Sequence, residues 1–120
     1  MSYKPSVLVV DDESGILDTL RILLRNEGFE VTTAQGGKAG LEQIRSGAYE
    51  IILSDVRMPG ATGIEALRQV RRVGLSVPFV LMTAFGDVLV HDEAQRQGAL
   101  LLDKPFDAGD LRRAIVTALG

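Results

Sequence analysis

The sequence predicts an α/β domain in which helices cover both faces of a parallel, five-stranded sheet. Short runs of β-branched and leucine residues alternate along the chain with segments whose apolar residues have helical periodicity. Most of these runs are apolar without interruption, which is typical of strands buried on both faces of a parallel sheet. This alternation favours right-handed strand–helix–strand crossovers and a single layer of sheet between two layers of helices.

The strands are predicted from five short segments. Val7–Val10 is a continuous apolar run, and Ile51–Leu53 and Phe79–Met82 have the same character. Glu30–Ala34 is more polar and is better suited to the edge of the sheet. Leu100–Leu102 completes the set, although leucine is a weaker strand former than valine or isoleucine.

The helices between the strands are predicted from apolar residues that recur on one side. The residues that mark these helices are, in chain order, Ile16, Leu17, Leu20, Leu23 and Leu24; Ala39, Leu41 and Ile44; Ile64, Ala66, Leu67 and Val70; Val88, Leu89, Val90 and Ala94; and Leu111, Ala114, Ile115, Ala118 and Leu119. Asn26 and Gly28 predict the end of the first helix, and Gly47 that of the second. The fourth helix, Asp87–Gln97, lacks a narrow apolar stripe.

Polar residues follow four of the predicted strands at the point where each strand ends. Asp11 and Asp12 follow the first strand, Asp55 the third, Thr83 the fourth and Lys104 the fifth. The carboxyl ends of parallel strands meet at one edge of the sheet, and ligands of open α/β sheets bind there. We therefore expect these five side chains to converge on one small region.

The residue types predict a metal-assisted phosphoryl-transfer site. Carboxylates ~4 Å apart repel by about 4 kcal/mol per pair at an effective dielectric of ~20, so a cluster of Asp11, Asp12 and Asp55 favours a divalent cation. Mg²⁺, or Mn²⁺ in its place, prefers such oxygen ligands. Asp55 could act as a nucleophile towards phosphorus, and Thr83 and Lys104 could donate hydrogen bonds to the phosphoryl oxygens.

Each of these residues also has a purely structural interpretation. Asp12 could cap the helix that begins near Ser14, and Asp55 could be a turn residue ahead of Pro59. Thr83 could approach a helix, and Lys104 could be an exposed loop lysine. The joint occurrence of these residue types on matching strand ends favours the functional interpretation.

With these residues in view, the chain resembles the receiver domains of two-component response regulators over nearly its whole length. The matching segments are Val7–Asp12 (VLVVDD), Ile52–Gly63 (ILSDVRMPGATG), Met82–Asp87 (MTAFGD) and Lys104–Phe106 (KPF). The stretches DVRMPG and TAFGD are most similar to receivers of enhancer-binding transcription activators. The resemblance implies a single receiver domain over 1–120, a flavodoxin-like (βα)5 three-layer sandwich with strand order 2-1-3-4-5.

The resemblance also implies a role for each matching residue. Asp55 would be the phosphoacceptor, Asp11 and Asp12 would hold Mg²⁺ together with it, and Arg57 would contribute its backbone carbonyl to the metal. Thr83 and Lys104 would contact the phosphoryl group.

Two further expectations concern the fifth strand. The resemblance implies a cis bond between Lys104 and Pro105, which is chemically accessible because X–Pro bonds prefer trans only weakly. In the family pattern an aromatic residue lies three positions before this lysine, and here that position is Leu101. In the family this aromatic residue moves inwards when the threonine shifts towards the phosphoryl group. Leucine has no ring or hydroxyl to make that movement, so the same coupling between the two residues is not predicted here.

The implied function is signal transduction rather than turnover of a separate substrate, so no enzyme activity is expected. A histidine kinase or histidine phosphotransfer protein would donate the phosphoryl group. The surface of the fourth helix, fifth strand and fifth helix would change in response and control an output domain, a partner or a homodimer. Leu89 and Val90 could be exposed for such a contact or buried.

Composition limits the other classes of function. The chain has 120 residues, no cysteine and a formal net charge of −3, with its basic residues scattered, so no direct nucleic-acid contact is expected. No apolar run of about 18 residues is present, so neither a membrane span nor a signal peptide is expected, and a cytoplasmic location follows by default. His91, the single histidine, is expected to be an ordinary surface residue.

Three alternatives stay open beside this interpretation. An aspartyl-phosphate phosphatase of the haloacid-dehalogenase type needs a second aspartate two positions after the nucleophile, where this chain has Arg57. A dinucleotide-binding module needs a glycine-rich turn after the first strand, where the chain has Asp11-Asp12-Glu13. A receiver-like interaction domain that is not phosphorylated is favoured by Leu101 alone.

Overall fold

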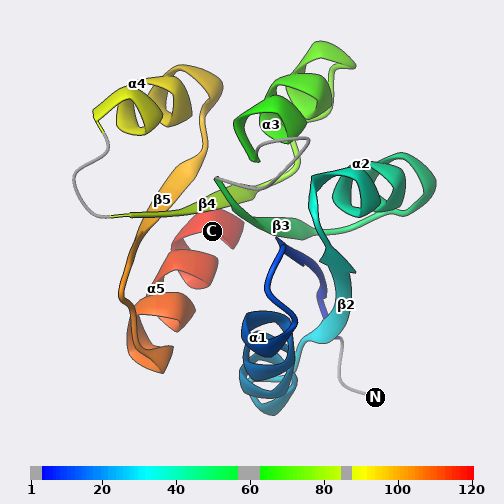
Figure 1. The fold of residues 1–120 in the computed structure, drawn as a ribbon, viewed down its shortest axis with the longest axis vertical. Helices are drawn as coiled ribbons and strands as arrows, with labels where there is room; N and C mark the ends of the chain where they lie inside the picture. Colours follow the sequence, from blue (N-terminus) through cyan, green and yellow to red (C-terminus); the bar gives the residue numbers. More distant parts are fainter. Residues whose placement is uncertain (1–3, 57–62, 85–87) are drawn as a thin grey trace.

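Five parallel strands form one sheet in the order β2-β1-β3-β4-β5 (Figure 1), which confirms the predicted fold class. A computed structural model of the chain describes residues 4–56, 63–84 and 88–120. The strands are β1 (Ser6–Asp11), β2 (Glu30–Gln35), β3 (Ile51–Asp55), β4 (Phe79–Ala84) and β5 (Leu100–Lys104). The polar strand β2 lies at an edge of the sheet, as its composition predicts.

Helices follow the strands in strict alternation and cover both faces of the sheet. They are α1 (Ser14–Asn26), α2 (Gly37–Ser46), α3 (Gly63–Arg72), α4 (Val88–Gln97) and α5 (Ala108–Leu119). In Figure 1, α1 and α5 lie on one face of the sheet, and α2, α3 and α4 lie on the other. The predicted Asp87 start of the fourth helix lies outside the described residues.

Alternating side chains of each strand supply two separate hydrophobic cores. On β1, Val7 and Val9 pack with α1 and α5, whereas Leu8 and Val10 pack on the face covered by α2 and α3. All four side chains are at most 2% exposed, as expected for a central strand with helices on both sides. The continuous apolar run in the sequence therefore reflects two cores rather than one.

The two ends of α1 test the predicted helix cap at Asp12 and the predicted stop signal at Gly28. The N-cap position is Glu13, and no side chain accepts a hydrogen bond from the helix there, so Asp12 is not a helix cap. At the other end Gly28 has a φ of 92°, a conformation that glycine adopts without strain, so the predicted stop signal is confirmed.

The fourth helix has a partly polar inner face, which explains its poor amphipathy. Val90 and Ala94 are buried at 7% and 1% exposure, but Glu93 between them is also buried at 8%. The Glu93 carboxylate accepts a hydrogen bond of 2.6 Å from Arg68 Nε on α3. Leu89 is 81% exposed, so only one of the pair Leu89 and Val90 faces solvent.

Among the helices of the described residues, none combines the length and the apolar character needed to cross a membrane.

Candidate functional site

The strand register brings three charged side chains to one face of the sheet. Val9 of β1 lies opposite Leu53 of β3, and both face the core beneath α1 and α5, as does Leu102 of β5. Asp11, Asp55 and Lys104 each follow one of these residues by two positions. Because side chains alternate along a strand, all three point to the same side at the carboxyl edge of the sheet.

The charged atoms lie close to one another. One carboxylate oxygen from each of Asp11, Asp12 and Asp55 lies within 4.8 Å of the other two. The Nζ atom of Lys104 is 3.4 Å from Asp55 Oδ1 and 3.8 Å from Asp11 Oδ2. The predicted convergence of these four residues is confirmed, and the loop-lysine alternative for Lys104 is wrong because it ends β5 inside an ionic cluster.

Asp11 is the most constrained of the acidic residues. It is fully buried, and its Oδ1 accepts a hydrogen bond of 3.0 Å from the backbone N–H of Glu13. Burial raises the pKa of Asp11 above its ordinary value, and the neighbouring Asp55 and Asp12 carboxylates add to the rise. The Glu13 N–H and the Lys104 ammonium group oppose this effect.

One carboxylate oxygen of Asp11 is left unsatisfied by the described residues. Asp11 Oδ2 is buried and has no hydrogen-bond partner among the described residues; its nearest cation is Lys104 at 3.8 Å. Buried carboxylate oxygens are normally satisfied, and three carboxylates exceed the charge of one ammonium group. Hard oxygen ligands in this arrangement fit a divalent cation such as Mg²⁺.

The remaining predicted residues have different outcomes. Asp12 is half-buried, and its backbone carbonyl accepts a hydrogen bond of 3.2 Å from Gln35 Nε2. Thr83 is 2% exposed on β4 and follows Met82, the register partner of Asp55, so it reaches the same edge of the sheet. Arg57 lies outside the described residues.

Ser54 is a site residue that the sequence did not single out. Its hydroxyl donates a hydrogen bond of 3.0 Å to the backbone carbonyl of Asp55, and the residue is 1% exposed. A polar residue within an otherwise apolar strand was the available signal, because a buried hydroxyl requires a partner.

The fifth strand agrees with the resemblance at two points. The peptide bond between Lys104 and Pro105 is cis, as predicted. Leu101 lies opposite Leu81 and packs against the core that α4 shares with α2 and α3. Leu101 is partly buried there, and its side chain has no polar atom.

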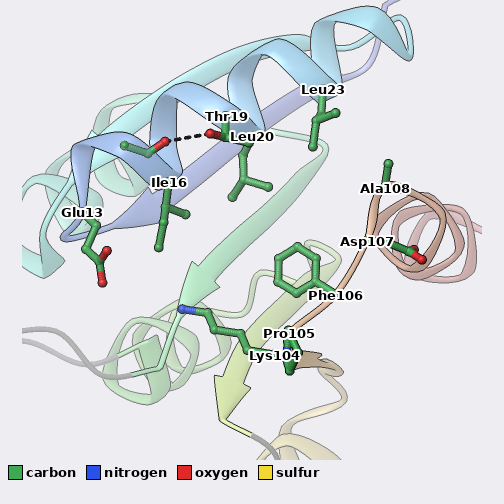
Figure 2. Close-up of a pocket in the computed structure, with 11 residues that line it drawn as sticks. Glu13, Ile16, Thr19, Leu20, Leu23, Lys104, Pro105, Phe106, Asp107 and Ala108 are labelled. Atoms are coloured by element: carbon green, nitrogen blue, oxygen red, sulfur yellow. Dashed lines mark hydrogen bonds between the residues drawn. The ribbon is translucent and has the colours of Figure 1, made fainter.

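An apolar groove lies beside the cluster. Its volume is about 770 Å³, and it runs between α1 and the segment after β5. Figure 2 shows Ile16, Leu20 and Leu23 on the side of α1 that faces Phe106 and Lys104. The groove therefore joins an apolar surface to the charged edge of the sheet.

His91 lies apart from the acidic cluster, on the exposed surface of α4, as predicted. Its Nε2 is 3.5 Å from Asp103 Oδ1 on β5.

Comparison with known proteins identifies the family. A family model described as the response regulator receiver domain matches residues 7–116. The transcriptional regulatory protein ZraR of Escherichia coli K12 is 37% identical over 114 residues, which make up 94% of this chain and 26% of ZraR. FixJ of Bradyrhizobium diazoefficiens is 36% identical over 120 residues, 99% of this chain and 58% of FixJ.

Solved structures of receiver proteins have the same fold as this chain and match nearly all of its length. The chemotaxis response regulator CheY4 of Vibrio cholerae superposes with a TM-score of 0.89 at 30% identity, and the match covers 98% of this chain and all of CheY4 (100%). The chain thus spans about a quarter of ZraR and the full length of CheY4. The family match, the strand order and these relatives together establish that the chain belongs to the response regulator receiver family of two-component signalling.

Proposed function

We propose that Asp55 is the phosphoacceptor of this receiver and that the reaction depends on a divalent cation, Mg²⁺ or Mn²⁺. The observation that carries the proposal is the position of the Asp55 carboxylate, 3.4 Å from Lys104 and beside the unsatisfied buried oxygen of Asp11. Asp11, Asp12 and Asp55 would hold the cation, with the backbone carbonyl of Arg57. A bound cation would neutralise the carboxylates and the charge of the incoming phosphoryl group.

In the proposed reaction the donor is a phosphohistidine on a histidine kinase or a histidine phosphotransfer protein. An Oδ atom of Asp55 attacks phosphorus, a P–O bond forms and the P–N bond of the donor breaks. The electron pair of that bond stays on the imidazole nitrogen, which takes a proton from solvent. Lys104 and Thr83 then donate hydrogen bonds to the transferred phosphoryl oxygens.

The geometry of Lys104 supports its part in this reaction. In the resting site its ammonium group lies between Asp55 and Asp11 at 3.4 and 3.8 Å. The side chain is 32% exposed, so it is close enough to the acidic residues to offset their repulsion and open enough to meet a new anion. A phosphoryl group on Asp55 would give this ammonium group a stronger anionic partner.

The groove in Figure 2 is where we propose that the protein donor docks. It begins at Lys104 and continues over the apolar side chains of Ile16 and Leu20 on α1. A donor protein has to place its phosphohistidine against Asp55, so its neighbouring surface covers this groove, and apolar contacts there would hold it in position.

The phosphoacceptor assignment is tested by intact-protein mass spectrometry. The protein is incubated with acetyl phosphate, with Mg²⁺ or with a chelator. We expect added phosphoryl mass that requires Mg²⁺ and is absent in Asp55→Asn. Asp92→Asn is the matched control, because it removes an exposed carboxylate of α4 and should leave labelling intact. A wild-type protein that gains no mass would contradict the proposal, as would labelling that persists in Asp55→Asn.

The docking assignment is tested separately with a protein donor. Ile16→Lys should slow transfer from a phosphorylated histidine kinase while labelling by acetyl phosphate stays unchanged. Ile22→Lys is the control, because Ile22 lies on the same helix and is 60% exposed outside the groove. Equal slowing by the two variants would show that the groove is not the docking surface.

The proposal also covers the class of activity. The receiver acts as a phosphoacceptor with no turnover of a separate substrate, it contacts no nucleic acid itself, and it works in the cytoplasm. Residues 1–120 form one domain.

The proposed output surface consists of α4, β5 and α5. Phosphorylation changes this surface to control an output domain, a partner or a homodimer. The neighbouring side chains of Val88 and Leu89 on α4 are 68% and 81% exposed, and adjacent exposed apolar side chains support a protein contact at this surface.

A further inference from the structure

The start of α3 lies unusually close to the backbone of Asp55. A Cβ atom built on Gly63, the first residue of α3, would lie 2.4 Å from the Asp55 carbonyl oxygen. It would also lie 3.0 Å from Ser54 Oγ and 3.1 Å from Leu81 Cδ2. Ordinary contact begins at 3.4 Å, so a side chain at this position would require a displacement of ~1 Å. The nearest atom belongs to the backbone and cannot rotate away.

Hydrogen bonds tie the same backbone to its neighbours. The N–H of Gly63 donates to the carbonyl of Val56 at 3.0 Å, and the N–H of Val56 donates to the carbonyl of Met82 on β4 at 3.1 Å. The Ser54 hydroxyl donates to the carbonyl of Asp55 at 3.0 Å. The peptide units on the carboxyl side of Asp55 are therefore held between β4 and the start of α3.

We infer that Gly63 is a positioning residue for phosphoryl transfer and that Ser54 assists it; this inference rests on the proposed phosphoacceptor role of Asp55. The absence of a side chain at Gly63 lets α3 close onto the Asp55 carbonyl. That contact sets where the Asp55 carboxylate stands relative to Asp11 and Lys104. Neither residue touches the transferred group, so both act through Asp55.

The geometry predicts the size of the effect. A side chain at Gly63 moves either α3 or the Asp55 backbone by ~1 Å, which is large against the 3.4 Å separation of Asp55 Oδ1 and Lys104 Nζ. Misplacement by about 1 Å costs on the order of 100-fold in rate where alignment controls the reaction. We expect Gly63→Ala to lower the phosphorylation rate per folded molecule by roughly 10- to 100-fold.

The experiment compares two alanine variants that create close contacts in different places. A Cβ on Gly47, which lies between α2 and the start of β3, would lie 2.7 Å from Tyr49 Cε2, away from the Asp55 carbonyl. Wild type, Gly63→Ala and Gly47→Ala are incubated with acetyl phosphate and saturating Mg²⁺ at a temperature where circular dichroism shows them folded. Gly47→Ala should keep its rate whatever stability it loses, whereas Gly63→Ala should lose rate even when trimethylamine N-oxide restores its stability.

Ser54→Ala keeps the test decisive if Gly63→Ala does not fold. It removes one hydroxyl and the hydrogen bond to the Asp55 carbonyl, and we expect a rate about fivefold lower. A Gly63→Ala protein with the wild-type rate per folded molecule would overturn the inference, and so would an equal loss in Gly47→Ala. If Gly63→Ala cannot be folded, an unchanged rate in Ser54→Ala overturns it. A wild-type protein that is not labelled at all overturns the proposed function instead.

Discussion

Replacing Asp11 with asparagine should make the metal-free protein more stable. Asp11 is fully buried, and one of its carboxylate oxygens has no hydrogen-bond partner among the described residues. Asparagine has nearly the same shape, and its side-chain oxygen can still accept the hydrogen bond from the Glu13 N–H. The substitution therefore removes a charge while it preserves the packing.

The distances give the magnitude. At the upper limit of 4.8 Å and an effective dielectric of ~20, Asp55 and Asp12 each repel Asp11 by about 3.5 kcal/mol. Lys104 at 3.8 Å attracts it by about 4.4 kcal/mol on the same scale. The repulsions exceed the attraction by about 2–3 kcal/mol, and half-exposed Asp12 contributes less than this full value. We expect Asp11→Asn to stabilise the protein by about 1–2 kcal/mol, or about 5–10 °C in Tm.

The pH dependence has a definite sign. Burial raises the folded-state pKa of Asp11 above its ordinary value, so protonation of Asp11 stabilises the folded wild type in acid. This contribution is lost as pH rises through the raised pKa. The free energy of unfolding of Asp11→Asn should therefore exceed that of the wild type only slightly in acid and by the whole expected amount at neutral pH. Asp92→Asn, which removes an exposed charge on α4, is the control, and its stability should respond to Mg²⁺ as that of the wild type does.

The assay is thermal or urea unfolding in a chelator and again in Mg²⁺. Mg²⁺ at about 100 times its Kd should stabilise the wild type by about 2.7 kcal/mol and should stabilise Asp11→Asn much less. If Asp11→Asn is less stable than wild type in the chelator at neutral pH, the charge argument is wrong. An equal response of both proteins to Mg²⁺ would remove Asp11 from the metal site.

Three further predictions concern the response to phosphorylation and the packing and surface of α4. Lys104→Ala should still bind Mg²⁺ in isothermal titration calorimetry but fail to show the phosphorylation-dependent change in the NMR amide shifts of α4 and β5; a normal change would mean that the lysine's role is misassigned. Arg68→Ala and Glu93→Gln should each destabilise the fold, and a double-mutant cycle of unfolding free energies should show that the two residues stabilise it together. The hydrogen bond from Arg68 lowers the pKa of Glu93, so this coupling should be lost as pH falls through the lowered pKa. Leu89→Glu should leave phosphorylation and monomer stability unchanged but weaken any phosphorylation-dependent dimer in analytical ultracentrifugation, because Leu89 is 81% exposed; an unaffected dimer would exclude this residue from the contact.

Local patterns in the sequence were sufficient to predict the elements and the location of the site. The continuous apolar run of Val7–Val10 marks a central strand, and polar Glu30–Ala34 marks an edge strand. Asp11, Asp55 and Lys104 were predictable as neighbours because each ends a strand, and parallel strands present the same ends together. These inferences use only the order and periodicity of residues along the chain.

Long-range contacts were not predictable in this way. The sequence left Leu89 and Val90 undecided, because the inner face of α4 depends on Glu93 meeting Arg68 from another helix. It also treated Asp11 and Asp12 as an equivalent pair, whereas the structure buries Asp11 completely and leaves Asp12 half-buried. Which side chain of such a pair turns inwards depends on the neighbouring strands.

By itself the sequence determined the alternation of strands and helices, the strands at the centre of the sheet and the acidic edge that carries Asp55, because hydrophobic periodicity and residue type are local properties. Only the tertiary structure decided that Asp11 Oδ2 lacks a hydrogen-bond partner among the described residues and that Gly63 closes onto the Asp55 carbonyl. Both depend on atoms from segments distant in the chain, and their separation is set by how the helices pack on the sheet.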